Sequence, residues 1–122
     1  MAEITTQRLG LAGEELAARF LAACGFVVLA SRFRCREGEV DLVMRRGPLL
    51  LFVEVKTRRG HHCGAPEEAL TPRKLQRLRR AAHRYLQQQP QPAGTVYRMD
   101  LVAVDWLGEG QGCHLRHYPG IR

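Results

Sequence analysis

Two neighbouring stretches of the chain alternate side chains at the two-residue period of a β-strand. They are residues 39–45, which read EVDLVMR, and residues 49–57, which read LLLFVEVKT. Between them, Arg45-Arg46-Gly47-Pro48 carries residues that favour a tight turn. The pattern predicts an antiparallel hairpin of two largely buried strands.

A helical period of apolar residues marks residues 6–24 as a first helix. Its apolar stripe consists of Leu9, Ala12, Leu16, Phe20 and Ala23. Glu14 lies at the edge of this stripe, and Glu15 points nearly opposite to it. Glu14 is therefore the helix carboxylate that can reach an interior site. The alternative for Glu14 is an ordinary solvated helix charge.

A second helix is predicted from Thr71 to about Gln89. Thr71 and Pro72 are favourable as the N-cap and the first helical residue, and Pro90 ends the helix. The side chains expected to face the core are Leu75, Leu78, Ala82 and Tyr85.

Further strands are predicted at residues 26–33, 96–104 and 114–118, with a loop rich in Gly and Pro at residues 59–68. Strands mixed with helices predict an α/β fold. A length of 122 residues suits one domain spanning residues 1–122.

Four charged residues interrupt the two apolar strands of the hairpin: Glu39, Asp41, Glu54 and Lys56. Burying a charge is costly unless the charge is paired or bound to a metal. If the turn contains an even number of residues, Asp41 lies opposite or diagonal to Glu54, and Lys56 shares their face. Two carboxylates this close suit a hard cation such as Mg²⁺ or Mn²⁺.

These motifs resemble a known signature. Asp41, a gap of twelve residues and then Glu54-Val55-Lys56 resemble the D…(D/E)xK pattern of the restriction-endonuclease-like nuclease superfamily. The order of motifs more closely resembles the YraN family of small bacterial proteins, up to about Asp105. The matching segments are Gly13-Glu14…Ala17, Gly25-Phe26, residues 38–42 and 52–58, Lys74 and Asp100-Leu101-Val102. The archaeal Holliday-junction resolvases are similar at a greater distance.

The resemblance implies a restriction-endonuclease-like fold, in which helices flank a mixed central sheet. It implies that Asp41 and Glu54 bind Mg²⁺ or Mn²⁺, and that Lys56 orients the attacking water and balances charge. The helix glutamate of the resemblance corresponds to Glu14, a further catalytic and metal-binding candidate. Glu39 belongs to the Gly-Glu-x-Asp version of the motif and is a fourth candidate ligand.

The positive charge of the chain points to a polyanionic partner. The formal net charge is +7 and the isoelectric point is near 9.9. The second predicted helix carries a stripe without an acidic residue, and Arg58 follows the Glu-Val-Lys motif. The candidate nucleic-acid-binding residues are Arg58, Arg73, Lys74, Arg77, Arg80 and Arg84. The alternative is a solvated helix face without a ligand.

Other features narrow the class of protein. No apolar run is long enough to span a bilayer, and the first residues do not form a secretory signal, so we expect no membrane partner. The four cysteines have no CxxC spacing and indicate reduced thiols in the cytoplasm.

The sequence therefore predicts a metal-dependent endonuclease that hydrolyses phosphodiester bonds, with DNA, including branched DNA, as the favoured substrate. One alternative is a nucleic-acid-binding protein that keeps the fold without independent catalysis. Another is an interaction protein in which the acids and Lys56 form a buried ion network. Whether the substrate is DNA or RNA stays open, as do the roles of Glu39 and Asp100. Cleavage of junctions would require two active sites and hence a homodimer.

Overall fold

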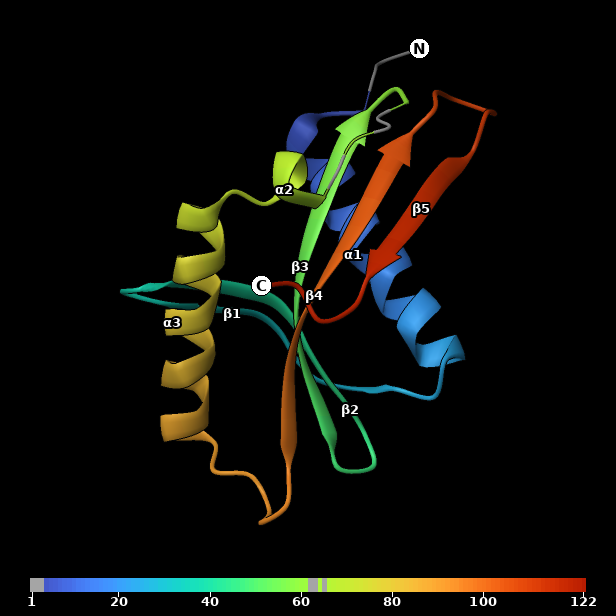
Figure 1. Cartoon of the computed structure of the whole chain (residues 1–122). Coiled ribbons are helices and arrows are strands. Elements are labelled where there is room, and N and C mark those ends of the chain that lie inside the picture. The colour runs from blue at the N-terminus through green and yellow to red at the C-terminus, as the bar shows by residue number, and fades with distance from the viewer. Residues whose placement is uncertain (1–3, 62–63, 65) are drawn as a thin grey trace.

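In a computed structural model, residues 4–61, 64 and 66–122 are described. In this part of the chain, a five-stranded sheet is flanked by two long helices (Figure 1). Along the chain the elements are α1 (Thr6–Ala23), β1 (Val27–Cys35), β2 (Gly38–Arg46), β3 (Leu49–Arg59), α2 (Pro66–Ala69), α3 (Pro72–Gln88), β4 (Val96–Trp106) and β5 (Cys113–Tyr118).

The strands lie in the order β1-β2-β3-β4-β5. β3 and β4 are parallel, and every other neighbouring pair is antiparallel. A parallel pair needs a long crossover connection, and α3 lies in the one between β3 and β4. The predicted mixed α/β fold is confirmed.

The predicted hairpin is confirmed as β2 and β3. Gly47 and Pro48 connect the two strands, and Gly47 takes a positive φ of 57° that favours glycine. The pairing runs from Arg46 opposite Leu49 to Leu42 opposite Val53. Because one face of each strand is buried, this register also decides which side chains share a face.

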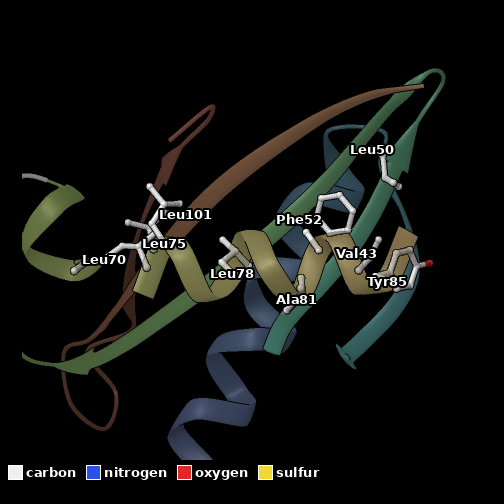
Figure 2. Close-up of a cluster of buried hydrophobic side chains, with 12 residues drawn as sticks. Val43, Leu50, Phe52, Leu70, Leu75, Leu78, Ala81, Tyr85 and Leu101 are labelled. Carbon is white, nitrogen blue, oxygen red and sulfur yellow. The ribbon is translucent and has the colours of Figure 1, made fainter. Parts of the chain in front are cut away.

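Each long helix covers one apolar face of the sheet. Figure 2 shows the cluster under α3, where Leu75, Leu78 and Ala81 pack against sheet residues that include Phe52 and Leu101. The second cluster joins α1 to the other face: Ala17, Leu21, Phe26, Leu42, Met44, Leu51, Val53, Val102 and Val104. The predicted core side of α3 is confirmed, since Leu75, Leu78, Ala82 and Tyr85 are all buried.

The prediction of the apolar stripe of α1 was wrong, because the helix is rotated about its axis and buries a different set of residues. The residues that α1 buries are Leu9, Gly13, Ala17 and Leu21, whereas Leu16 is 36% exposed and Ala23 is exposed. Gly13 lies directly against Thr57 of β3, so a Cβ at Gly13 would stand 1.9 Å from the Thr57 hydroxyl oxygen. Small residues let the helix approach the sheet closely, and that approach outweighs the burial of the larger Leu16.

The remaining element predictions hold apart from their bounds. β1 and β4 each extend two residues beyond the predicted strands, to Cys35 and Trp106. In the predicted loop, β3 continues to Arg59 and α2 occupies Pro66–Ala69, while residues 62–63 and 65 lie outside the described part of the chain. No helix among the described residues has the length and apolar character to cross a bilayer.

Candidate active site

The sheet opens into a fork at Asp41. The pairing of β2 with β3 ends at Leu42 and Val53, yet β2 stays paired with β1 down to Gly38, and β3 stays paired with β4 up to Arg59. Figure 1 shows the result: β1 and the start of β2 turn towards α3, while β3 and β4 continue past them. At the fork the carboxylate of Asp41 replaces the backbone partner, because its Oδ2 accepts a hydrogen bond of 2.7 Å from the Val55 N–H.

Asp41 is held in an environment that disfavours its charge. Its exposed fraction is 8%, and this burial is the main reason that its pKa is raised to about 6. The Val55 hydrogen bond and Arg34 act in the opposite direction, whereas the negative charges of Glu14 and Glu39 raise the pKa further. Glu14 of α1 is thus close enough to Asp41 for its charge to act on it.

Glu54 has an even stronger preference for the protonated form. Its pKa is raised to about 8, first by burial and then by the charges of Asp41 and Glu39. Lys74 and Lys56 oppose this shift. Lys56 follows Glu54 by two residues on β3 and so shares its face. The structure therefore brings Asp41, Glu54 and Lys56 together, as the sequence parity predicted.

Lys56 lies among other positive charges. Burial lowers the pKa of Lys56, and the charges of Lys74 and Arg58 lower it further, while Glu54 raises it. Arg58, which the sequence predicts to bind nucleic acid, thus lies close enough to act on Lys56, and its phosphate contact stays a prediction. A pocket of 220 Å³ adjoins this group and is lined by Glu39, Glu54, Lys74, Arg77 and Leu78. Strand β3 supplies one wall of this pocket and α3 another.

The two outer acids are held by arginines of β1. Arg32 Nε lies 3.2 Å from Glu14 Oε2, and Arg34 Nε lies 3.3 Å from Glu39 Oε2. Arg32 has a φ of 51°, an uncommon backbone conformation for a residue with a side chain. Sequence reasoning missed both arginines, because nothing in the strand pattern distinguishes them from other exposed charges.

The donor set fits a hard divalent cation, although it is not arranged as a closed cage. Asp41 and Glu54 supply carboxylate oxygens, and their mutual repulsion is what a cation would relieve. In the described part of the chain, no three or more His, Cys, Asp or Glu side chains are grouped to hold a metal. Glu14 and Glu39 would have to leave their arginines to join such a site.

The basic face of α3 is only partly free of acids. Arg73, Lys74, Arg77 and Arg80 are exposed, as the sequence predicted. Arg84 is half-buried, and its guanidinium bonds to both carboxylate oxygens of Glu37 at 3.3 and 3.4 Å. The expectation of a stripe without any neutralising acid was therefore wrong at Arg84, because the turn between β1 and β2 brings in Glu37.

Asp100 lies away from the fork. It is fully buried and pairs with Val53 in the parallel register, so it faces the side of the sheet opposite to Glu54. Its carboxylate accepts hydrogen bonds from Arg98 at 2.8 and 3.0 Å and from the Gly120 N–H at 3.1 Å, and lies 2.7 Å from His117 Nε2. These contacts tie the segment after β5 to β4.

Comparison with known proteins places this arrangement in a family. The model described as "Uncharacterised protein family UPF0102" matches residues 13–104, a range that includes Glu14, the fork and α3. A UPF0102 protein of Nocardia farcinica is 50% identical over 98 residues, which cover 80% of this chain and 76% of the relative. Another, of Parafrankia sp., is 46% identical over 99 residues and covers 81% and 83% of the two chains.

A third relative, from Chloroflexus aurantiacus, is 44% identical over 102 residues, which cover 84% of this chain and 82% of that protein. The matched range contains the YraN-like motifs noted in the sequence. The chain belongs to the UPF0102 family.

Proposed function

We propose that this protein is a metal-dependent nuclease with a restriction-endonuclease-like fold, which hydrolyses phosphodiester bonds in nucleic acid, with DNA as the favoured substrate. One observation carries the proposal: the sheet forks at Asp41, and Asp41, Glu54 and Lys56 converge there in surroundings that disfavour the charge of both acids. A folded protein keeps such a costly arrangement where a ligand relieves it.

The two carboxylates share one part in this reaction, which is to hold the metal ion. Asp41 and Glu54 would hold Mg²⁺ or Mn²⁺, with Glu14 and Glu39 as outer acids close enough to act on Asp41. A bound divalent cation supplies a Lewis acid that polarises the phosphate and lowers the pKa of bound water. Water then adds to phosphorus, one P–O ester bond breaks, and the protons of the water pass to the leaving oxygen and to solvent.

Lys56 contributes a positive charge beside the reacting phosphate. Its ammonium orients the attacking water and stabilises the negative charge that develops in the transition state. The exposed cations of α3 bind the nucleic-acid backbone. Arg73, Arg77 and Arg80 are spaced along one face of the helix, and no side chain in the described residues forms a salt bridge with them.

A second candidate function is nucleic-acid binding without independent catalysis. The ion pairs that hold Glu14 and Glu39 favour it, because among the described residues they leave Asp41 and Glu54 as the acids at the fork without a salt bridge. A cleavage assay distinguishes the two functions.

The experiment is cleavage of duplex, single-stranded and branched DNA, and of the matching RNA, with Mg²⁺ or Mn²⁺. Wild-type protein should cut at least one substrate, and Asp41→Ala should abolish cutting. Lys56→Ala should lower the cleavage rate on the order of a hundredfold while affinity changes little. Lys56→Arg should not restore the rate, because a guanidinium is planar and bulkier than an ammonium.

Binding is tested separately by replacing Arg73, Arg77 and Arg80 with alanine. Each lost phosphate contact should reduce the slope of log affinity against log salt by roughly one. Arg19→Ala is the control, because Arg19 lies on α1 in a salt bridge with Glu15. Binding that is undiminished by the triple replacement would contradict the assignment of this face. Equal cleavage by wild type and Asp41→Ala would contradict the proposal that Asp41 belongs to a nuclease active site.

A further inference from the structure

Lysine is rare in this chain, and both lysines meet at the fork. Of the 19 lysines and arginines, only Lys56 and Lys74 are lysines. They come from different elements, β3 and α3: Lys74 lines a pocket together with Glu54, and Lys56 follows Glu54 by two residues on the same face of β3. The charge of Lys74 is close enough to lower the pKa of Lys56. In a sequence that uses arginine for nearly every positive charge, this convergence distinguishes the site from the rest of the basic surface.

Lys74 is well placed to present its charge at this position. It lies in the first turn of the 17-residue helix α3, and its backbone N–H is capped by the Thr71 hydroxyl at 3.3 Å. The N-terminus of a helix carries a partial positive charge, which adds to the charge of the side chain. Arg77 follows on the next turn and lines the same 220 Å³ pocket as Lys74.

Glu39 and Glu54 line the same pocket as Lys74, but neither forms a salt bridge with the two ammonium groups. In residues 4–61, 64 and 66–122, no carboxylate lies within 4.0 Å of Lys56, Lys74 or Arg77. Like charges that converge without a carboxylate between them repel each other. An anion that several donors can share removes this repulsion, and a phosphate group has the oxygens to accept from all three cations.

We propose that Lys74 is a second catalytic lysine, and that Lys56, Lys74 and Arg77 together bind the non-bridging oxygens of the reacting phosphodiester. The proposal rests on the proposed function and extends it. Lys74 stays protonated throughout: it donates hydrogen bonds and stabilises negative charge, and it transfers no proton. Ammonium groups suit this task because they are compact charges that two neighbouring side chains can direct at one phosphate.

The pocket is tested first without any cleavage. Inorganic phosphate is titrated into the full chain, and the Lys56 ammonium resonance is followed by ¹H–¹⁵N NMR. Lys74→Ala should weaken phosphate binding roughly tenfold, the effect of losing one charge-assisted hydrogen bond. Lys74→Arg should keep most of the affinity because the charge remains. Arg79→Ala, which removes an exposed charge from the same helix outside this pocket, should change the affinity less than twofold.

Cleavage then separates a catalytic Lys74 from a residue that only binds. At saturating substrate, Lys74→Ala should lower the rate on the order of a hundredfold, while the half-saturating concentration rises by no more than the roughly tenfold loss of phosphate affinity. A rise in that concentration at an unchanged rate would overturn the catalytic assignment. Equal effects of Lys74→Ala and Arg79→Ala on phosphate affinity would overturn the proposal that Lys74 lies in a phosphate-binding pocket. If wild-type protein cleaves no substrate, the proposed function is wrong. The phosphate titration still decides whether Lys74 binds phosphate.

Discussion

The contact between α1 and β3 gives the sharpest test of how the fold positions the site. A Cβ added at Gly13 would lie 1.9 Å from Thr57 Oγ1 and 3.0 Å from both Thr57 Cβ and Cγ2. Rotation of the Thr57 side chain exchanges one close atom for another, and its Cβ is fixed to the backbone. We therefore expect Gly13→Ala to push α1 away from the sheet, together with the adjacent Glu14.

The size of the effect follows from two opposing contributions. Overpacking of this kind costs about 3 kcal/mol, near the upper end of its usual range, because a backbone-linked atom is involved. Replacing glycine by alanine within a helix returns about 1 kcal/mol. The net loss for Gly13→Ala is about 2 kcal/mol, or a fall in Tm of roughly 8 °C.

Gly10 provides a matched control on the same helix. A Cβ there would meet nothing within 4 Å, so Gly10→Ala should gain about 0.5–1 kcal/mol in stability. Urea denaturation of both variants measures the difference, which should be about 3 kcal/mol. Thr57→Ala in the Gly13→Ala background should recover at least 1 kcal/mol, since it removes two of the three close atoms. Equal stability of the Gly10 and Gly13 variants would refute the close approach.

Three further predictions concern charge, pH and metal binding. Burial by itself would raise the pKa of Asp100, but its hydrogen bonds to His117, Arg98 and the Gly120 N–H lower this pKa below its usual value. The ionised carboxylate therefore stabilises the fold above the pKa that Asp100 has in the unfolded chain. This stabilisation is lost as the pH falls through the pKa of Asp100 in the folded protein. Asp100→Asn should cost about 3 kcal/mol at pH 7 and weaken the loss of stability in acid, as measured by urea denaturation at several pH values; an unchanged acid transition would contradict this role. The raised pKa of Glu54 acts in the opposite sense: with EDTA present, stability should fall as the pH rises from 4.5 through about 8. Glu54→Gln should remove most of that fall, and Mn²⁺ should raise the Tm of wild type at pH 8 but not of an Asp41→Ala, Glu54→Ala variant; equal Mn²⁺ effects on both proteins would argue against the metal site.

The sequence by itself determined the elements whose signals are local. The two-residue alternation predicted the β2–β3 hairpin, and its parity placed Asp41 near Glu54, with Lys56 on the same face. Thr71 and Pro72 predicted the start of α3, and the apolar period predicted its buried side. Caps, turns and periodicity act over a few residues, so each can be read without knowing the rest of the chain.

Tertiary structure decided what depends on contacts between distant segments. The buried face of α1 was set by Gly13 against Thr57, and Arg84 was neutralised by Glu37 from another element. The arginines that hold Glu14 and Glu39 also come from a separate strand, β1.

The fork itself belongs to the same category. Periodicity reports which side of an element is apolar, and it does not report where two paired strands separate or which side chain takes the place of a lost backbone partner. The hydrogen bond from the Val55 N–H to Asp41 and the meeting of Lys56 with Lys74 exist only once the sheet twists and α3 packs across it. Close approach, ion pairing and burial depend on three-dimensional distance, and for residues far apart in the chain only folding sets that distance.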